Sequence, residues 1–449
     1  HVSSIKSSLP FLHFFDGFRT SHEIQKIQAI NKNTLNELMP VDELTAFKRR
    51  ALSPVNPCQR GTAQNPDIFF QNREACNKYY DDVYKIVEAS MEEFAQKTGR
   101  VYHPFDYYGP KNPSNLIVIM GSGAQTVIDV ASHESNLGVI VVRLYRPFNS
   151  KAFVKLIPSS VKCITVLDRT KESGATFEPL CQDVISALSE YDMQIKVLGG
   201  RYGLGSKEFT PQCVQAVLSN MQSKSSKNHF TVGIFDDVTN TSLELNEDYK
   251  IPHSYKQLKF FGLGGDGTVS ANKNAIKIIG ENSEYFTQGY FEYDSKKSGS
   301  LTISHLRISP NEIRAPYLVT EADFIAIHNF NFVARYRILE DLKQNGTVLL
   351  NTALRPEQLS THLPTNFKKA LLDKKAKLFI IDAQEKAQKI GLKNKINTIM
   401  QSAFFKISNV IDYNKAKKAL KMAAEKTYGK KGEKVVNMNF EAIELGEQV

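Results

Sequence analysis

The sequence predicts an α/β protein in which a doubly wound parallel sheet is followed by a second α/β domain. Short, continuous apolar runs, typical of strands buried on both faces, recur between residues 115 and 228. Stretches with helical spacing separate these runs. Beyond residue 229, further apolar runs surround a glycine-rich turn. A length of 449 residues leaves room for two or three domains.

The first part of the chain is expected to be the end of an α/β domain, over residues 1–40, followed by a connecting segment over 41–114. Within this segment, residues 77–97 carry apolar side chains at helical spacing and predict a helix. Residues 102–113 contain three prolines, which predicts a linker.

The doubly wound domain is expected over residues 115–228. Its strands are the apolar runs 116–120, 139–144, 163–167 and 195–198, and helices are expected over 124–134 and 177–189. Ligands on such sheets bind at the carboxyl ends of the strands. The residues expected at those ends are Gly121, Asp168, Arg169, Gly200 and Arg201.

The second α/β domain is expected over residues 229–412. Its strands are predicted at 230–235, 259–262, 317–319, 324–327, 347–350 and 376–381. Residues 413–449 form a Lys-rich helical tail without an obvious core.

Composition fits a soluble intracellular protein, with 41% hydrophobic and 23% charged residues. The net charge of +10 comes largely from lysines on solvated helix faces near the end, so we expect no nucleic acid partner. No apolar run reaches membrane-spanning length. The five cysteines contain no Cys-x-x-Cys spacing, which predicts a reducing compartment and neither an iron–sulfur cluster nor a metal site in this chain.

The glycine-rich turn over residues 262–267 follows an apolar run and precedes a predicted helix. Such a turn suits an anion, because a helix N-terminus presents unpaired N–H groups; a tight structural turn is the alternative. We assign Gly262, Gly264, Gly265 and Gly267 to a candidate anion or ligand loop. The turn lacks the Gly-Lys-Ser/Thr of a P-loop, and no Asn pair follows Gly265-Asp266-Gly267 as a thiamine diphosphate motif requires.

A dinucleotide fingerprint is matched formally by Gly262, Gly264 and Gly267, with Glu281 or Glu284 as the acidic residue downstream. This leaves open a nucleotide-binding oxidoreductase, which titration calorimetry with NAD(P)H would test.

Together with five other blocks, the turn resembles the middle portion of the pyruvate:ferredoxin (flavodoxin) oxidoreductase family. The resemblance runs from residue 1 to about residue 420. The blocks are residues 14–23 (FFDGFRTSHE), 60–67 (RGTAQNPD) with 71–74 (QNRE), 166–172 (VLDRTKE), 199–209 (GGRYGLGSKEF), the turn itself at 261–274, and 288–299 (QGYFEYDSKKSG) with 304–307 (SHLR).

The resemblance implies the fold and the activity. Residues 1–40 would end the N-terminal thiamine-enzyme (pyrimidine-type) domain, 115–228 would form the transketolase-C-terminal-like domain, and 229–412 the gamma-type domain. The family decarboxylates pyruvate oxidatively to acetyl-CoA with thiamine diphosphate, Mg, [4Fe-4S] clusters and coenzyme A. The complete enzyme would be a homodimer that passes electrons to ferredoxin or flavodoxin. It would act in the cytoplasm or in a hydrogenosome-like organelle.

The same resemblance implies that this chain does not turn over alone. The cluster cysteines and the thiamine motif are missing from it, and the substrate-binding part of the first domain would precede His1. We therefore expect no catalytic residue within this chain, which depends on the remaining domains or subunits. A non-catalytic scaffold descended from the enzyme is the alternative function.

The resemblance implies contacts with coenzyme A at Lys296, Lys297 and Ser298, because the third domain of the family lies over the coenzyme A site. An exposed basic loop without a ligand is the alternative. Two ammonium groups beside a glycine-ended turn suit a phosphate-bearing ligand. Ser270 and Ser300 stand where the family tends to have glycine, and each adds a Cβ atom at a position of close approach.

The other polar clusters are expected to be structural. In residues 14–23, we expect Phe14 and Phe15 to pack, Asp16 to pair with Arg19, and His22 to form a hydrogen bond, although His22-Glu23 is also compatible with an acid–base pair.

Three further groups have the same structural interpretation. Asp168 and Arg169 are expected to form an ion-pair group with Glu172, and His305 and His328 are expected to be buried core residues.

A purified polypeptide of this sequence is expected to be colourless, since it lacks the ligands for a cluster. Visible absorption of the iron–sulfur type in its spectrum would contradict this prediction.

Overall fold

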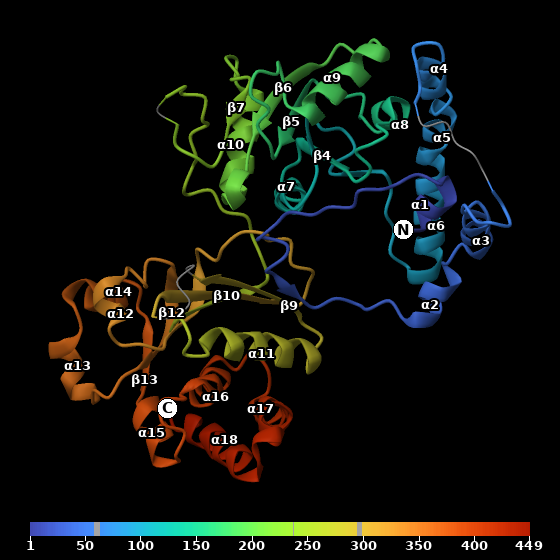
Figure 1. The fold of residues 1–449 in the computed structure, drawn as a ribbon. Coiled ribbons are helices and arrows are strands. Elements are labelled where there is room, and N and C mark those ends of the chain that lie inside the picture. Colours follow the sequence, from blue (N-terminus) through green and yellow to red (C-terminus); the bar gives the residue numbers. More distant parts are fainter. Residues whose placement is uncertain (58–62, 237, 294–298) are drawn as a thin grey trace. The chain divides into compact units, whose positions relative to one another are not determined.

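The computed structural model describes residues 1–57, 63–236, 238–293 and 299–449. The chain folds as two compact units, one of residues 1–16 and 28–251, the other of residues 17–27 and 252–449 (Figure 1). Each unit is built on one β-sheet. The predicted fold class, a doubly wound sheet followed by a second α/β domain, is confirmed. The five-part division stays a prediction, since compactness separates only these two units.

The first unit contains a six-stranded sheet of order β2-β4-β3-β5-β6-β7. All neighbouring strands are parallel except β2, which pairs with β4 in the antiparallel sense. The strands are β2 Phe105–Tyr108, β3 Asn115–Ile119, β4 Leu137–Val142, β5 Cys163–Asp168, β6 Lys196–Arg201 and β7 Phe230–Thr231. Since β4 and β5 lie on opposite sides of β3, the order reverses beside β3, at the topological switch point of this fold.

Helices cover both faces of this sheet. They are α7 Gly123–Ala131, α8 Ser150–Lys155, α9 Pro179–Glu190 and α10 Pro211–Gln222. On one face, α7 and α10 pack on Ile117 and Val139. On the other, α8 and α9 pack on Leu116 and Ile140. Alternate residues of each strand therefore enter opposite cores, which is why the strands are apolar throughout.

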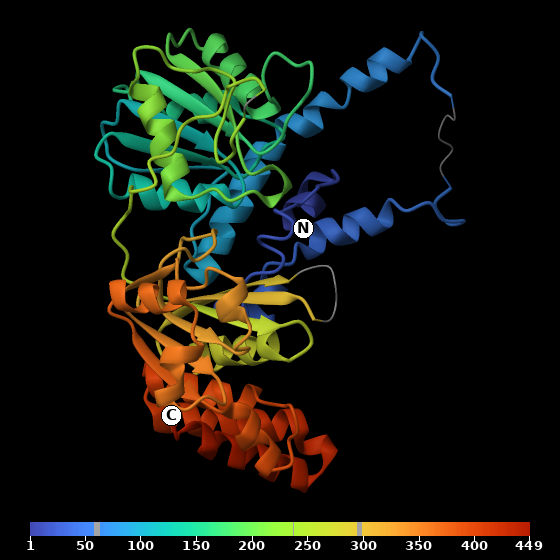
Figure 2. The same cartoon turned by 90° about the vertical axis from the view of Figure 1, so that its left-hand side faces the viewer.

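In the described part of the same unit, six helices precede this sheet. They are α1 Val2–Ser7, α2 Lys32–Glu37, α3 Val41–Arg49, α4 Phe69–Glu74, α5 Asn77–Asp81 and α6 Val83–Thr98. Helices α4, α5 and α6 follow one another along a rod (Figure 2). The helix predicted over residues 77–97 is confirmed as α5 and α6, with a break at Asp82.

The second unit contains a seven-stranded sheet of order β1-β9-β10-β8-β11-β12-β13. Strands β8, β11, β12 and β13 are parallel, whereas β10 pairs with β8 and β9, and β1 with β9, in the antiparallel sense. The strands are β1 Ile24–Gln25, β8 Lys256–Leu263, β9 Phe286–Tyr293, β10 Leu301–Ser309, β11 Ala322–Ile327, β12 Leu342–Asn351 and β13 Lys377–Ile381.

Among the described residues of the second unit, eight α-helices cover the two faces of its sheet. They are α11 Thr268–Glu281, α12 Phe332–Arg335, α13 Pro356–His362, α14 Thr365–Asp373, α15 Ala383–Lys389, α16 Asn397–Ser408, α17 Tyr413–Tyr428 and α18 Glu433–Gly446. Helices α11, α16, α17 and α18 share one core with Leu258 and Phe260 of β8. Helices α12 and α14 pack on the opposite face, around Phe261. Short 3₁₀ turns, η1 Leu204–Ser206 and η2 Gly429–Lys431, occur in the first and second units.

Several expectations about elements are wrong. Residues 102–113 are more than a linker, because they contain β2. Residues 317–319 lie in an irregular segment rather than a strand, whereas β9 and β10 were not expected. Residues 413–449 are helical as expected, but they have a core, to which α17 and α18 contribute Leu420 and Ile443.

None of the helices in the described parts of the chain combines the length and apolarity that a membrane-spanning segment needs.

Candidate functional site

The glycine turn joins β8 to α11 at the carboxyl edge of the parallel strands of the second unit. Gly265 and Gly267 both have φ of +89°, a conformation that other residues rarely adopt. A Cβ atom on Gly262 would lie 2.5 Å from the Thr268 side chain. Among the described residues, a Cβ atom on Gly265 would meet no atom within 4 Å, which leaves room there for a ligand to approach.

The Asp266 carboxylate braces the turn. It accepts hydrogen bonds from the backbone N–H of Leu263 (2.8 Å) and of Thr268 (2.7 Å). The side chain of Asn397, at the start of α16, donates to the Asp266 carbonyl. For the N–H groups of Gly265 and Gly267, no partner is found among the described residues. These hydrogen bonds hold the turn in place and leave the N–H groups of Gly265 and Gly267 as donors. The Asp266 carboxylate already offsets part of the dipole of α11.

The hairpin between β9 and β10 meets the glycine turn. The candidate residues Lys296, Lys297 and Ser298 lie outside the described residues. The residues that follow them are placed, because Gly299 N–H donates to the Gly264 carbonyl (3.2 Å) and Gly264 N–H donates to the Ser300 carbonyl (2.7 Å). Gly299 and Ser300, which directly follow this candidate segment in the sequence, thus lie beside the glycine turn.

Buried polar side chains lie behind this turn. Thr268 Oγ1 is 2.8 Å from His328 Nδ1, directly after β11. The His328 carbonyl accepts from Asn351 Nδ2 (2.9 Å), and Asn351 Oδ1 accepts from the N–H of Ala383 (3.0 Å). Burial lowers the pKa of His328 to about 4, although nearby Asp266 acts in the opposite direction. His328 is therefore neutral near pH 7, and it is buried as expected.

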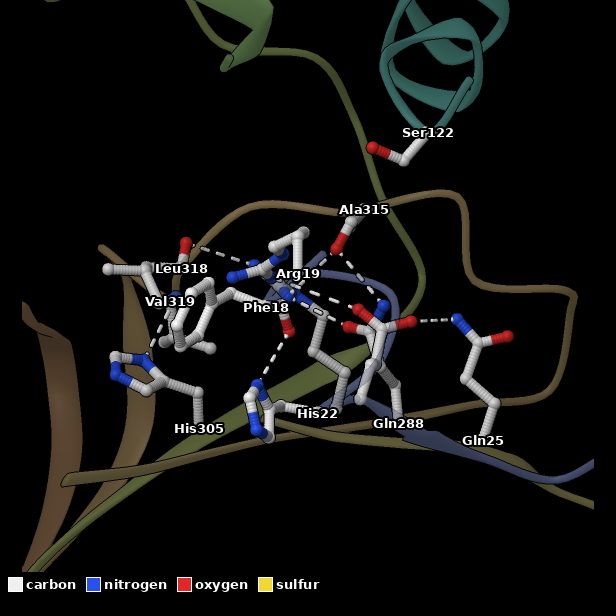
Figure 3. Close-up of polar contacts among 12 residues, drawn as sticks. Phe18, Arg19, His22, Gln25, Ser122, Gln288, His305, Ala315, Leu318 and Val319 are labelled. Atoms are coloured by element: carbon white, nitrogen blue, oxygen red, sulfur yellow. Dashed lines mark hydrogen bonds and ion pairs between the residues drawn. The ribbon is translucent and has the colours of Figure 1, made fainter. Parts of the chain in front are cut away.

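A second polar cluster lies on the antiparallel half of the same sheet (Figure 3). Its face is opposite α11, because Leu306 and Ile308 of β10 point into the core that α11 shares. Its centre is Arg307 of β10, which is 2% exposed. The guanidinium donates to Gln257 Oε1 (3.0 Å) and Gln288 Oε1 (2.8 Å) on the flanking strands. It also donates to the carbonyls of Ala315 (3.2 Å) and Leu318 (3.1 Å). Arg307 therefore ties the 313–319 segment to the sheet.

His305 continues this layer one pleat further along β10. Its Nε2 is 2.7 Å from Glu292 Oε2, and its Nδ1 accepts from the N–H of Val319 at 3.1 Å. Burial lowers the pKa of His305 to about 4. The pKa of Glu292 is also lowered, because the His305 hydrogen bond and nearby cations outweigh the effect of its burial. His305 is thus a neutral, fully partnered core residue, as expected for its structural role.

Residues 17–27 lie over this polar layer. Ile24 pairs with Gly289 in the sheet register, and the Arg19 guanidinium lies 4.1 Å from the centre of the Tyr290 ring. Arg19 Nη2 is 3.9 Å from Glu23 Oε2, and burial raises the pKa of Glu23. His22 Nδ1 is 3.1 Å from the Phe18 carbonyl, so the expected hydrogen bond is present.

The expected pairing of Asp16 with Arg19 joins residues of two different units and stays a prediction. Asp16 belongs to the first unit, where its carboxylate accepts from Ser122 N–H (2.6 Å) and lies 3.1 Å from Arg169 Nη1. Arg169 also donates to the Gly203 carbonyl at 2.9 Å. These residues follow β3, β5 and β6, at the switch point. The Asp16 carboxylate thus lies at the carboxyl ends of these strands, the edge where sheets of this kind bind ligands.

Two expectations about side chains are wrong. Asp168 does not share an ion pair with Arg169 and Glu172; it accepts from the N–H groups of Leu180 and Cys181 at the start of α9. Burial raises the pKa of Asp168 to about 6.

Phe14 and Phe15 do not pack, since they are 65% and 62% exposed.

Within the described chain, no three His, Cys, Asp or Glu side chains are grouped so that they could hold a metal ion. The cysteines that the structure describes are free thiols: Cys76, Cys163, Cys181 and Cys213.

The sequence did not indicate the contacts that Thr268 and Asn397 make beside the turn. It also did not indicate the hydrogen bonds of Arg307 with two glutamines. For Arg307, a signal was available. Gln257 and Lys259, like His305 and Arg307, recur at every second position, which places them on one face of a strand. No such local signal exists for Asn397, which is brought to the turn from α16 by the tertiary fold.

Three family models match the chain in succession. Residues 1–92 match the thiamine diphosphate-binding part of pyruvate flavodoxin/ferredoxin oxidoreductase, residues 114–214 match core domain II of pyruvate:ferredoxin oxidoreductase, and residues 257–449 match pyruvate ferredoxin/flavodoxin oxidoreductase. The chain belongs to the pyruvate:ferredoxin/flavodoxin oxidoreductase family. The resemblance predicted from the six sequence blocks is therefore confirmed.

Individual members of the oxidoreductase family show the extent of the match. The pyruvate:ferredoxin oxidoreductase of Moorella thermoacetica is 51% identical over 449 residues, which cover 99% of this chain and 38% of that protein. A probable pyruvate-flavodoxin oxidoreductase of Escherichia coli is 45% identical, and the match covers 100% of this chain and 39% of that protein. The pyruvate dehydrogenase [NADP(+)] of Cryptosporidium parvum is 47% identical, and the match covers 99% of this chain and 24% of that protein. The chain thus spans well under half of these oxidoreductases.

Among solved structures, pyruvate oxidoreductase subunit PORC of Thermotoga maritima is 20% identical to this chain, with a TM-score of 0.35. The match covers 44% of this chain and 97% of the PORC chain.

Proposed function

We propose that this chain is part of an enzyme that oxidatively decarboxylates pyruvate, passes the acetyl group to coenzyme A and delivers the electrons to ferredoxin or flavodoxin. Its own contribution is domain scaffold and contacts to coenzyme A. The observation that carries the proposal is the 51% identity over 449 residues to a pyruvate:ferredoxin oxidoreductase, together with three successive matches to that family.

The cofactors of the complete enzyme follow from the same reasoning. The match of residues 1–92 to a thiamine diphosphate-binding model supports thiamine diphosphate in the complete protein. We propose Mg and [4Fe-4S] clusters there too, held by parts of the protein other than this chain. This chain contributes no catalytic residue in the proposal, since its polar clusters are engaged in holding loops to sheets.

Coenzyme A is proposed to contact the glycine turn and the β9–β10 hairpin. Among the described residues, none lies within 4 Å of a Cβ atom on Gly265, and the N–H groups of Gly265 and Gly267 have no partner. Gly299 and Ser300, which follow Lys296 and Lys297 in the sequence, bond to Gly264. Phosphate oxygens match N–H donors and ammonium groups. Because Asp266 repels a phosphate, the two lysines would supply the charge that makes binding favourable.

The electron acceptor is proposed to be chosen elsewhere in the protein. Relatives named for ferredoxin, flavodoxin and NADP(+) are 51%, 45% and 47% identical to this chain, so these differences in acceptor leave little mark on it. We propose a homodimer, acting in the cytoplasm or a mitochondrion-related organelle, with the remaining domains or subunits as its obligatory partners.

The proposed function is tested by expressing the full-length protein and measuring reduction of ferredoxin with pyruvate and coenzyme A. Turnover that needs both substrates is the expected result. A full-length protein with bound cofactors and no turnover would indicate the alternative, a non-catalytic scaffold.

Replacing both Lys296 and Lys297 with Ala is expected to raise the KM for coenzyme A about tenfold or more, because two partly screened phosphate contacts are lost. Decarboxylation of pyruvate precedes the acceptor and should stay largely intact. The measurement is steady-state kinetics against both substrates, at low and high salt.

The matched control for this pair is Lys430→Ala with Lys431→Ala, two adjacent exposed lysines of η2. This control should leave both KM values unchanged. An unchanged KM for coenzyme A in the Lys296/Lys297 variant, or an equal loss against pyruvate, would refute the assignment of the hairpin.

A further inference from the structure

We propose that His328 is a positioning residue for the acyl-acceptor site, which acts through the Thr268 hydroxyl to fix the start of α11 and with it the glycine turn. This inference rests on the proposed binding of coenzyme A at that turn. It assigns a role to residues that lie behind the turn and do not face the ligand.

The geometry forms one connected path across the carboxyl edge of the parallel strands. Thr268 is the first residue of α11, and its hydroxyl lies 2.8 Å from His328 Nδ1. His328 is held in turn by its backbone, since its N–H donates to the Phe261 carbonyl (2.9 Å) and its carbonyl accepts from Asn351 (2.9 Å). Asn351 accepts from the N–H of Ala383, which begins α15. The path thus reaches from β8 to the helix after β13.

The packing around Thr268 shows that this contact has little freedom. Thr268 is fully buried, and a Cβ atom on Gly262 would lie 2.5 Å from its side chain. Gly262 is therefore required for Thr268 to reach His328. Its role in the glycine-rich pattern is close packing within the protein, whereas no described residue lies within 4 Å of a Cβ atom on Gly265.

Thr268 consequently fixes the turn through two groups, its backbone N–H and its side-chain hydroxyl. The backbone N–H of Thr268 is held by Asp266 Oδ1 at 2.7 Å, and its side chain is held by His328. Removing the side-chain bond leaves a buried polar group without its partner and allows the first turn of α11 to shift. Such a shift would move the N–H groups of Gly265 and Gly267 away from the phosphate position, where small displacements are costly.

The test compares His328→Leu with His328→Asn in the full-length enzyme. The two side chains have the same branched shape, but only Asn places a polar atom near the position of Nδ1. Since the Asn amide can donate or accept, rescue does not depend on the tautomer of His328. We expect the Leu variant to raise the KM for coenzyme A about tenfold. It should leave kcat at saturating coenzyme A and the KM for pyruvate unchanged, and the Asn variant should recover most of the loss.

Variants of Thr268, the hydrogen-bond partner of His328, test the same contact independently. Thr268→Val removes the hydroxyl at nearly constant shape, whereas Thr268→Ser retains it. Thr268→Val should reproduce the His328→Leu effect, and combining the two should add little, because both remove one hydrogen bond.

The outcomes separate this inference from the function on which it rests. Equal KM values for coenzyme A in the Leu and Asn variants, or a fall in kcat with no change in KM, would overturn the positioning role. If the Lys296/Lys297 variant also fails to change the KM, the proposed site itself is refuted. If that variant does raise the KM, only the role of His328 fails.

Discussion

The Arg307→Met variant is expected to lose about 3–5 kcal/mol of the stability of the second unit. Arg307 is 2% exposed and donates to four oxygens, two on glutamine side chains and two on backbone carbonyls. Methionine fills a similar volume, so the loss arises from unpaired polar groups and not from a cavity. The Ala315 carbonyl keeps a donor in Gln288 Nε2 (3.1 Å), but all four oxygens lose their hydrogen bond to the guanidinium.

The measurement is hydrogen exchange of the β10 amides in the variant and the parent protein. Exchange should accelerate through β10 and the 313–319 segment. Arg337→Met is the matched control, because Arg337 is 82% exposed at its side chain and makes only a surface ion pair with Glu340. Comparable protection in the Arg307 and Arg337 variants would show that the polar layer contributes little to stability.

Acidification from pH 7 to pH 5 is expected to destabilise the second unit by about 4 kcal/mol, about 2 kcal/mol for each buried histidine. Burial lowers the pKa of both His305 and His328 to about 4, below the unfolded value of 6.5. Between these values the unfolded chain binds more protons than the native one, so stability falls as the pH falls. Glu23, whose pKa is raised by burial, offsets part of this effect.

Denaturant unfolding at a series of pH values checks this prediction. The slope of stability against pH between 5 and 7 should become shallower in the variant that combines His305→Gln with His328→Asn, which cannot titrate at these positions. His362→Asn is the control, since His362 is exposed and should leave the slope as in the parent protein. A slope that does not differ between the double variant and the parent protein would refute the assignment to these histidines.

Patterns local in sequence predicted much of the fold. Continuous apolar runs located β3, β4, β5 and β11, because strands buried on both faces are apolar at every position. Strands β9 and β10 were missed, since one of their faces is polar and yet buried, with Gln288 and Arg307 as partners across the ladder. Strand β2 was missed because prolines flank it, and its pairing depends on β4.

The candidate site was predicted only in part. The glycine turn lies at the end of a strand and the start of a helix, as its sequence indicates. Its contacts with Asn397 and His328 join residues far apart in the chain, so no spacing rule could reveal them. The role of Gly262 was also hidden, because the sequence does not say that a glycine faces Thr268 and not a ligand.

By itself, the sequence determined the fold class, the family and the positions of most buried strands, because these depend on periodicity and on the order of motifs along the chain. The tertiary structure alone decided the partners of charged side chains. Asp16 lies beside Arg169 in the first unit and Arg19 lies over Tyr290 in the second, and both partners are far away in the sequence. A charge in a partly buried position takes the partner that the packed elements bring within reach, and proximity in sequence does not fix that choice.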